Sequence, residues 1–220
     1  MRRAGREVAI GLGAYAAYLA ARHVVWNDRG RDRARRNAAR VADAERRAGV
    51  FVERHVQHAA ARTPRLVTLL NAGYAVGNVT LSVGWLFALY RRGSPAYARE
   101  RRAAVAAFLA AVPVFATFPT APPRSLDGFI DTLRARGIDL DHPALVRLYN
   151  PIAAMPSYHM AFAVVTGLGV ASHGRSRTVR LAGRAYPVAV AAVVIGTGNH
   201  FVADVAAGSA LGAVARAVTR

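Results

Sequence analysis

Long apolar segments separated by arginine-rich loops are the feature that most constrains this sequence. A helix needs roughly 20 mostly apolar residues to cross a bilayer. Several segments of the 220-residue chain approach that length and composition. They are residues 8–26, 66–90, 103–118, 152–171, 185–198 and 200–218. Since no internal repeat or linker interrupts them, they predict one all-α membrane domain over residues 1–220, a six-transmembrane-helix bundle.

The part of the chain before residue 66 has a composition of its own. Its first apolar segment has a basic flank like that of a signal peptide. No small-residue cleavage site leads into a soluble domain, so we expect a retained anchor helix. Residues 27–65 are arginine-rich, and apolar residues recur at rough helical spacing between residues 38 and 61, which predicts an amphipathic interfacial helix. We therefore divide the chain into residues 1–65, the anchor and amphipathic segment, and residues 66–220, a five-helix catalytic part.

Charge and hydropathy together narrow the class of protein. All 30 positively charged side chains are arginine, 12 acidic residues oppose them and the net charge is +18, yet 54% of the residues are hydrophobic. This combination excludes a disordered basic arm, argues against a soluble nucleic-acid-binding domain and is typical of membrane spans joined by basic loops. The absence of cysteine excludes disulfides, thiolate metal sites and cysteine nucleophiles. The absence of lysine excludes Schiff-base chemistry and lysine-dependent phosphate sites.

The basic loops predict which side of the membrane each end of the bundle faces. Residues 91–102 hold five Arg and one Glu, and residues 172–184 hold four Arg and no acidic residue, so the positive-inside rule places both in the cytoplasm. The loop 119–151, with four Arg and four Asp, then lies on the outer side. Six spans place residues 27–65 there too, despite eleven Arg against five acidic residues. Either the first segment does not cross fully or this stretch lies on anionic headgroups.

Asp204 is the only acidic residue after Asp141, and it follows His200 by four residues within an apolar segment. Positions i and i+4 share one face of a helix, and a carboxylate in a membrane span is costly unless it is paired. A carboxylate that binds one imidazole nitrogen fixes the tautomer and leaves the other nitrogen as a nucleophile or base. Taken alone, the two residues are also compatible with a buried structural pair, in which each side chain serves only as the hydrogen-bond partner of the other.

A second histidine and a proline-rich corner fall at the same predicted membrane depth. His159 follows Pro156 at the start of the fourth segment, where free N–H groups suit an anion. Three prolines just past the third segment make a stiff corner from which Arg124 projects, and its planar guanidinium group can hold a phosphate. Alone, His159 is compatible with a core histidine and Arg124 with a headgroup contact. Together with the His–Asp pair, they predict phosphoryl transfer.

At these positions the chain resembles the type 2 phosphatidic acid phosphatase superfamily, and most closely its inositol-phosphorylceramide-synthase-like branch. The superfamily pattern has three blocks: Lys, six residues and Arg-Pro; Pro-Ser-Gly-His; and Ser-Arg, five residues, His, three residues and Asp. Here residues 119–124 look like the branch's first block, residues 156–159 form the second, and residues 197–204 keep part of the third. The resemblance spans residues 45–212. Further likenesses of that branch lie at residues 150–155 and 128–132, at Glu53 with Gln57 and at Asn71 with Tyr74.

Three departures from the pattern bear on phosphate binding. The first-block lysine is absent, the third-block arginine falls at Val194, and Tyr158 replaces the glycine of the second block. The implied phosphate-binding residues are Arg124, Ser157, Tyr158 and Asn199, partly through backbone N–H groups. Further candidates for the missing positive charge are Arg134, Arg136 and Arg147.

The resemblance implies a membrane lipid-phosphate phosphatase that uses no metal and no cofactor. His200 would attack phosphorus to form a phosphohistidine, and Asp204 would orient it. His159 would protonate the leaving alkoxide and then activate water, while Arg124 would neutralise charge on the phosphate oxygens. The expected partners are a lipid phosphate and the bilayer, not nucleic acid. The expected location is a bacterial plasma membrane, with the active site on the outer side.

Other interpretations stay open. The same site would act as a phosphotransferase if an alcohol replaced water as the acceptor. The fold would also suit a terpene cyclase that ionises a prenyl diphosphate, although only four of the sixteen Phe and Tyr residues, and neither Trp, lie after residue 149, which argues against an aromatic-lined chamber. The missing cations are compatible with a non-catalytic membrane scaffold, which the joint presence of His159, His200 and Asp204 opposes. Those three residues are also of the types that ligate a metal.

Overall fold

The computed structural model describes residues 2–219, with side chains described from residue 4 onward. The regular elements among those residues are all helices, with no strand. Met1 of the basic N-terminal flank and Arg220 at the end of the predicted domain lie outside the described residues. The helices are α1 (Arg2–Val25), α2 (Asp28–Arg47), α3 (Glu53–Ala61), α4 (Pro64–Ala72), α5 (Asn78–Arg91), α6 (Tyr97–Thr117), α7 (Pro143–Val146), α8 (Tyr158–His173), α9 (Arg177–Gly196) and α10 (Val202–Val218), with 3₁₀ turns at Pro123–Ser125 and Arg134–Arg136.

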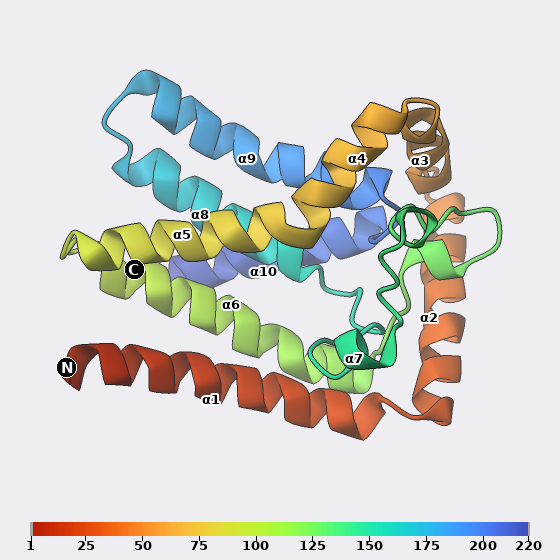
Figure 1. Cartoon of the computed structure of the whole chain (residues 1–220), viewed down its shortest axis with the longest axis horizontal. Coiled ribbons are helices and arrows are strands. Elements are labelled where there is room, and N and C mark those ends of the chain that lie inside the picture. The colour runs from red at the N-terminus through yellow and green to blue at the C-terminus, as the bar shows by residue number, and fades with distance from the viewer. Residues whose placement is uncertain (1, 220) are drawn as a thin grey trace.

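The longer helices form a bundle that one helix crosses at its end. Figure 1 shows α1, α5, α6, α8, α9 and α10 running alongside one another, with α2 lying across one end, which we call the α2 end. Helix α8 is central, since it packs against α5, α6, α9 and α10, while α1 packs against α6. The start of α1 and the end of α10 lie at the opposite end of the bundle. The loop between α6 and α8 lies at the α2 end, where the starts of α8 and α10 also meet.

Glycines let α8 approach its neighbours closely. A Cβ atom on Gly167 of α8 would lie 2.5 Å from the carbonyl oxygen of Gly183 in α9. One on Gly212 of α10 would lie 2.6 Å from the carbonyl oxygen of Ala161 in α8. Small residues that allow backbones to touch are typical of helices packed within a membrane. These contacts fix α9 and α10, the two helices whose connecting turn carries His200.

Within the described part of the chain, three helical segments are long and apolar enough to cross a membrane: Ala4–Val25, Pro64–Arg91 and Arg177–Gly196. The second combines α4 and α5, which a π-helical turn at Gly73–Gly77 joins into one continuous helix. The expected starts of later helices are displaced, because polar caps and not hydropathy decide them. Helix α8 begins behind the N-cap Ser157 instead of at residue 152, and α9 begins behind the N-cap Ser176 instead of at residue 185.

The arginine-rich segment before residue 66 folds as two helices, α2 and α3, and not as one helix across residues 38–61. The break between them contains Gly49, whose φ of +72° favours glycine. The apolar face of α2 is buried against the end of α1, the loops after α6 and the start of α10. This buried cluster consists of Val25, Ala34, Ala38, Val41, Ala42, Ala121, Ile152 and Phe201. Helix α2 therefore closes the end of the bundle where the candidate site lies.

A buried ion cluster ties α6, α8 and α10 together toward the opposite end. The Arg216 side chain donates hydrogen bonds to Glu100 Oε2 at 2.5 Å and to the Val165 carbonyl oxygen at 3.0 Å. The His173 Nε2 atom lies 3.2 Å from Glu100 Oε1. Glu100 is fully buried, and a carboxylate persists in apolar surroundings only when it is paired. The cluster therefore fixes the positions of these three helices relative to one another along their axes.

We predict that Glu100→Ala lowers the free energy of unfolding by about 3–5 kcal/mol, because it leaves the Arg216 charge buried without its carboxylate. Arg134→Ala is the matched control, since its ion pair with Asp139 is exposed and such pairs contribute about 1 kcal/mol or less. Denaturant unfolding of both variants in the same detergent gives the comparison. Equal losses in the two variants would contradict the structural role of the cluster.

Candidate active site

The turn between α9 and α10 places His200 beside Asp204. Asp204 Oδ2 accepts a hydrogen bond from the Phe201 N–H at 2.9 Å and lies 3.3 Å from His200 Nδ1. Both side chains are buried. When the carboxylate accepts the Nδ1–H of His200, the Nε2 atom is left unprotonated and free to act as a nucleophile or base. The structure thus forms the predicted pair.

Gly198 allows the chain to make this turn. Its φ of +67° lies in the left-handed region that favours glycine, and a Cβ atom there would lie 2.3 Å from Gln57 Nε2. The Gly198 carbonyl oxygen accepts a hydrogen bond from the Arg124 N–H at 2.8 Å. The turn that carries His200 is therefore bound directly to the proline-rich corner after α6.

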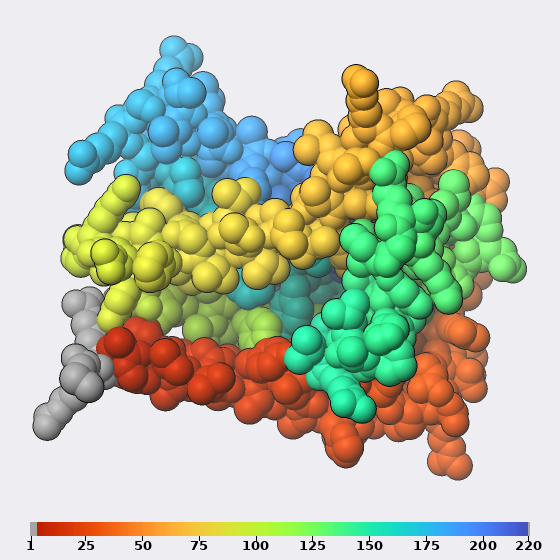
Figure 2. All heavy atoms as spheres, viewed as in Figure 1, coloured from red at the N-terminus to blue at the C-terminus, as the bar shows by residue number. Residues whose placement is uncertain are grey.

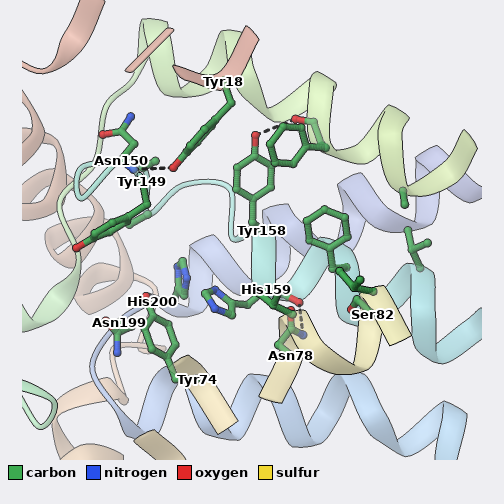
Figure 3. A pocket seen from close by; sticks show the side chains of 18 of the residues that line it. Tyr18, Tyr74, Asn78, Ser82, Tyr149, Asn150, Tyr158, His159, Asn199 and His200 are labelled. Atoms are coloured by element: carbon green, nitrogen blue, oxygen red, sulfur yellow. Dashed lines mark hydrogen bonds between the residues drawn. The ribbon is translucent and has the colours of Figure 1, made fainter. Parts of the chain in front are cut away.

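The ring of His159 faces the ring of His200 from the start of α8, as Figure 3 shows. The two ring centroids lie 5.6 Å apart, with the ring planes at 62°. Tyr74 stacks on the His159 ring at 4.5 Å, and the Asn78 side-chain amide donates to the His159 carbonyl oxygen at 3.2 Å. Residues of the continuous α4–α5 helix therefore hold the second histidine in place.

Arg124 reaches the same place from its 3₁₀ turn. Its Nε atom donates to Asp131 Oδ2 at 3.2 Å, and its guanidinium group donates to Asn199 Oδ1 at 2.5 Å. The Asn199 amide in turn donates to the Thr197 hydroxyl at 2.9 Å. Only 6% of the Arg124 side chain is exposed. A guanidinium group held at two points is preorganised to meet phosphate oxygens with its remaining N–H groups.

Reciprocal side-chain hydrogen bonds hold the loop that supplies Asp131. The Gln57 amide donates to the Ile130 carbonyl oxygen at 2.7 Å and accepts from the Ile130 N–H at 2.9 Å. The Asn71 amide donates to the Thr132 carbonyl oxygen at 2.8 Å and accepts from the Thr132 hydroxyl at 2.8 Å. Because the two amides flank Asp131, they fix its carboxylate next to the guanidinium group.

Sequence reasoning gave Gln57, Asn71 and Asp131 no role beyond their likeness to a family branch, Asp131 as part of residues 128–132. The balanced charge of the loop 119–151, which holds four Asp residues, did not distinguish among them, and only the likeness at residues 128–132 pointed to Asp131. Its pairing with the arginine depends on the fold, since the α3 and α4 amides bring it there.

The two histidines and Arg124 line one end of a cavity of about 560 Å³ whose lining residues come from α1, α5, α6 and α8 as well. Figure 2 shows the surface hollowed between α1 and α5. The rings on its wall are Tyr15, Tyr18, Tyr74, Trp85, Phe108, Tyr149, Tyr158 and Phe162. The sequence-based argument against an aromatic-lined chamber is therefore wrong. Most of these rings come from helices before residue 149, which sequence position alone does not place at the cavity.

Ser157 and Tyr158 lie close to His159 in sequence, but the side chain of neither brings a free polar atom to it. The Ser157 hydroxyl accepts from the Met160 N–H at 3.3 Å as the helix cap, and the Ser157 N–H donates to the Asp204 carbonyl oxygen at 3.1 Å. Ser157 is fully buried and does not line the cavity. The Tyr158 ring does line it, but its hydroxyl donates to the Phe108 carbonyl oxygen at 2.8 Å, on α6. Of the predicted phosphate-binding residues, the structure brings Arg124 and Asn199 to the histidines.

The further arginines considered for the missing positive charge lie elsewhere. Arg134 pairs with Asp139 at the surface, Arg136 binds the start of α4, and Arg147 is exposed. Val194, at the position of the third-block arginine, is buried in an apolar cluster between α8 and α9. Among the described residues, Arg124 is the only arginine that lines the cavity. No group of three or more His, Asp or Glu residues within that part of the chain is placed to hold a metal ion.

Comparison with known proteins gives a family but no individual relative. A family model, described as the PAP2 superfamily, matches residues 39–218. No curated protein and no solved structure matched the chain. The matched residues make up most of the chain and include both histidines, Asp204 and Arg124. The chain therefore belongs to the PAP2 superfamily, whose members are generally phosphatase-type enzymes.

Proposed function

We propose that this chain is a membrane lipid-phosphate phosphatase that works through a phosphohistidine on His200. The observation that carries the proposal is the meeting of His159, His200 and Arg124 at the polar end of a largely apolar cavity. Such a cavity can hold a hydrocarbon chain while the phosphate reaches the two imidazole rings. Membership of the PAP2 superfamily independently suggests phosphatase or phosphotransferase activity.

The reaction would proceed in two displacements at phosphorus. In the first, the Nε2 lone pair of His200 attacks phosphorus, the bond to the lipid oxygen breaks, and protonated His159 gives its proton to the leaving alkoxide. In the second, His159 takes a proton from water, the hydroxide attacks phosphorus, and the phosphorus–nitrogen bond breaks to release inorganic phosphate. Asp204 holds the Nδ1–H and stabilises the positive ring, and Arg124 stabilises charge on the phosphate oxygens. Such proton transfers contribute about 10²–10⁴-fold each.

We further propose that six helical segments span the membrane: α1, α4 with α5, α6, α8, α9 and α10. Their common direction supports this arrangement, and the loops after α5 and α8 lie at the end away from the histidines. Those loops are rich in arginine, so the positive-inside rule favours an active site on the outer side of a bacterial plasma membrane. The exposed arginines of α2 would then lie over anionic headgroups at the membrane interface. The likeness to the inositol-phosphorylceramide-synthase-like branch remains part of this proposal.

We predict that the purified protein releases inorganic phosphate from a lipid phosphate in EDTA, and that His200→Ala abolishes this release because no nucleophile remains. A screen of phosphatidic acid, polyprenyl phosphates and phosphoinositides identifies the substrate. Wild-type protein quenched during turnover should carry an acid-labile phosphoryl group that His200→Ala lacks. His55→Ala, on the exposed face of α3, is the matched control.

Equal rates of phosphate release in wild type and His200→Ala would contradict the proposal, as would complete loss of activity in EDTA. If an added alcohol takes up the phosphoryl or phospho-headgroup in place of water, the enzyme is a phosphotransferase that uses the same site. If no lipid phosphate is turned over and no phosphohistidine forms, the chain is a non-catalytic scaffold.

For Arg124→Ala we expect kcat to fall by about 10²–10³-fold, since the variant removes the donor that meets charge developing on the phosphate oxygens. Arg124→Lys should recover only part of this loss, because an ammonium group cannot bind Asn199 and a phosphate oxygen with a planar fork. Arg147→Ala removes an exposed arginine from the same loop and should leave kcat unchanged. Thermal unfolding of each variant verifies that the fold is intact. A loss of kcat in Arg147→Ala as large as that in Arg124→Ala would contradict the phosphate-binding role of Arg124.

The aromatic wall of the cavity favours one second candidate, the ionisation and cyclisation of a prenyl diphosphate. Aromatic faces stabilise cations, and rings from several helices surround this space. Incubation with a prenyl diphosphate distinguishes the two activities by gas chromatography and mass spectrometry. The phosphatase should give a linear prenyl phosphate or alcohol. A cyclic hydrocarbon would establish the second candidate in its place.

A further inference from the structure

Three carboxylates bind the first turn of α10, directly after His200. Glu53 Oε1 accepts from the Val202 N–H at 2.7 Å, and Glu45 Oε1 accepts from the Ala203 N–H at 2.6 Å. Asp204 accepts from the N–H just before them, as described above. Successive free N–H groups of one helix start therefore each have a carboxylate of their own. Two of these carboxylates come from α2 and α3, about 150 residues away in the sequence.

All three carboxylates are buried, and each has an oxygen atom without a partner. Glu45 is 4% exposed, and Glu53 and Asp204 are 0% exposed. Glu45 Oε2, Glu53 Oε2 and Asp204 Oδ1 are buried and make no hydrogen bond. A helix N-terminus offers only about half a positive charge, so it does not offset three ionised carboxylates in apolar surroundings. The cluster must therefore retain a proton.

The hydrogen bonds of the two glutamates indicate where that proton lies. Glu53 and Glu45 bind the consecutive N–H groups of Val202 and Ala203, so their carboxyl groups lie side by side at the start of α10. The Oε2 atom of each is buried without a partner, so a proton on one carboxyl group can be shared with the other. Asp204 has His200 as its own partner. Burial, together with the neighbouring Glu53 carboxyl group, raises the pKa of Glu45 to about 8. The titratable groups that face Glu45 are Glu53 from α3 and Asp204 from α10.

We propose that Glu45 and Glu53 share one proton and act as a positioning pair, which holds the first turn of α10 and thereby sets His200 and Asp204 for reaction. The proposal rests on the phosphatase function proposed above, since it assigns these residues to the same site. Neither glutamate lines the cavity, so both act through the helix start and not on the substrate. Sequence reasoning noted Glu53 only as a family likeness and assigned Glu45 nothing.

Glutamine substitution tests the shared proton, because an amide carries both an acceptor oxygen and a donor N–H. In Glu45→Gln or Glu53→Gln, the oxygen still accepts the backbone N–H while the amide N–H takes the place of the shared proton. Each single variant should keep kcat within about threefold of wild type at pH 7. The double variant turns two donors toward each other and should lose about 10²-fold in kcat, the size of effect that misplacing a reacting group by about 1 Å produces. KM should change little, because Arg124 and the cavity are untouched.

The pH dependence of stability tests the same proton without any turnover. The pKa of Glu45 is raised from 4.5 in the unfolded chain to about 8, so its stabilising contribution is complete below about pH 4.5 and is lost as pH rises through 8. The Tm of the wild-type protein should therefore fall between about pH 5 and pH 8 and level off at higher pH. Glu45→Gln should flatten this fall, since the amide does not titrate. Asp43→Asn, an exposed carboxylate on the same helix, should keep the wild-type profile.

An NMR measurement reports the position of His200 independently of activity. The Nδ1–H of His200, hydrogen bonded to Asp204, should give a downfield proton signal in wild type and in both single glutamine variants. The double variant should lose this signal. A double variant that keeps the signal and the wild-type kcat would overturn the positioning role. A single glutamine variant that loses as much kcat as the double variant would overturn the shared proton. A Tm that rises with added Ca²⁺ or Mg²⁺ and falls in EDTA would show that the carboxylates bind a cation instead.

The proposed function and this inference fail in different ways. If wild-type protein hydrolyses no lipid phosphate, the proposed function fails, while the pH profile of Tm and the His200 signal still decide whether the two glutamates share a proton and hold the pair. If wild-type protein is active and the double variant matches it in kcat and in the NMR signal, the inference alone fails.

Discussion

Each charge that this bundle buries needs a partner, because an isolated ion in apolar surroundings costs several kcal/mol. Toward one end of the bundle, Glu100 pairs with Arg216 and joins α6 to α10. At the α2 end, Arg124 binds Asp131 and Asn199, and the start of α10 collects three carboxylates. These pairs tie together segments that are far apart in the sequence. They decide where the loops lie, and the candidate site is made of those loops.

The site is thus built on helix ends and not on helix faces. His159 lies in the first turn of α8, His200 directly precedes α10, and Arg124 follows α6 in a short turn. Helix ends have unpaired N–H groups, which suit a phosphate and which, at the start of α10, bind three carboxylates. The glycine contacts between α8, α9 and α10 make these ends rigid with respect to one another. An apolar cavity that begins at the same point gives the site a place for a hydrocarbon chain.

Residues of the site could be predicted where their partners are close in the sequence. They could not be predicted where the partners come from distant helices and loops. His200 and Asp204 are four residues apart, so their spacing sufficed to predict the pair, although Asp204 in the first turn of α10 reaches back to His200 in the preceding turn. The corner at Arg124 follows from its prolines. Asp131, Glu45 and Tyr74 act on those residues from other helices and loops, and no spacing in the sequence connects them. Ser157 is the instructive case, because its neighbours place it in a motif while its own hydrogen bonds use it as a helix cap.

The sequence by itself determined the all-helical class, the fit to a membrane and the candidate residues of the site, because hydropathy, charge and local spacing depend only on neighbours along the chain. The tertiary structure decided what the first 65 residues do. Where a separate anchor and interfacial helix were expected, α1 contributes rings to the cavity, α2 closes the bundle end, and α2 and α3 supply the glutamates at α10. The physical reason is that a buried polar group is satisfied by whatever the fold brings within about 3 Å, and that partner is fixed only when the helices have packed.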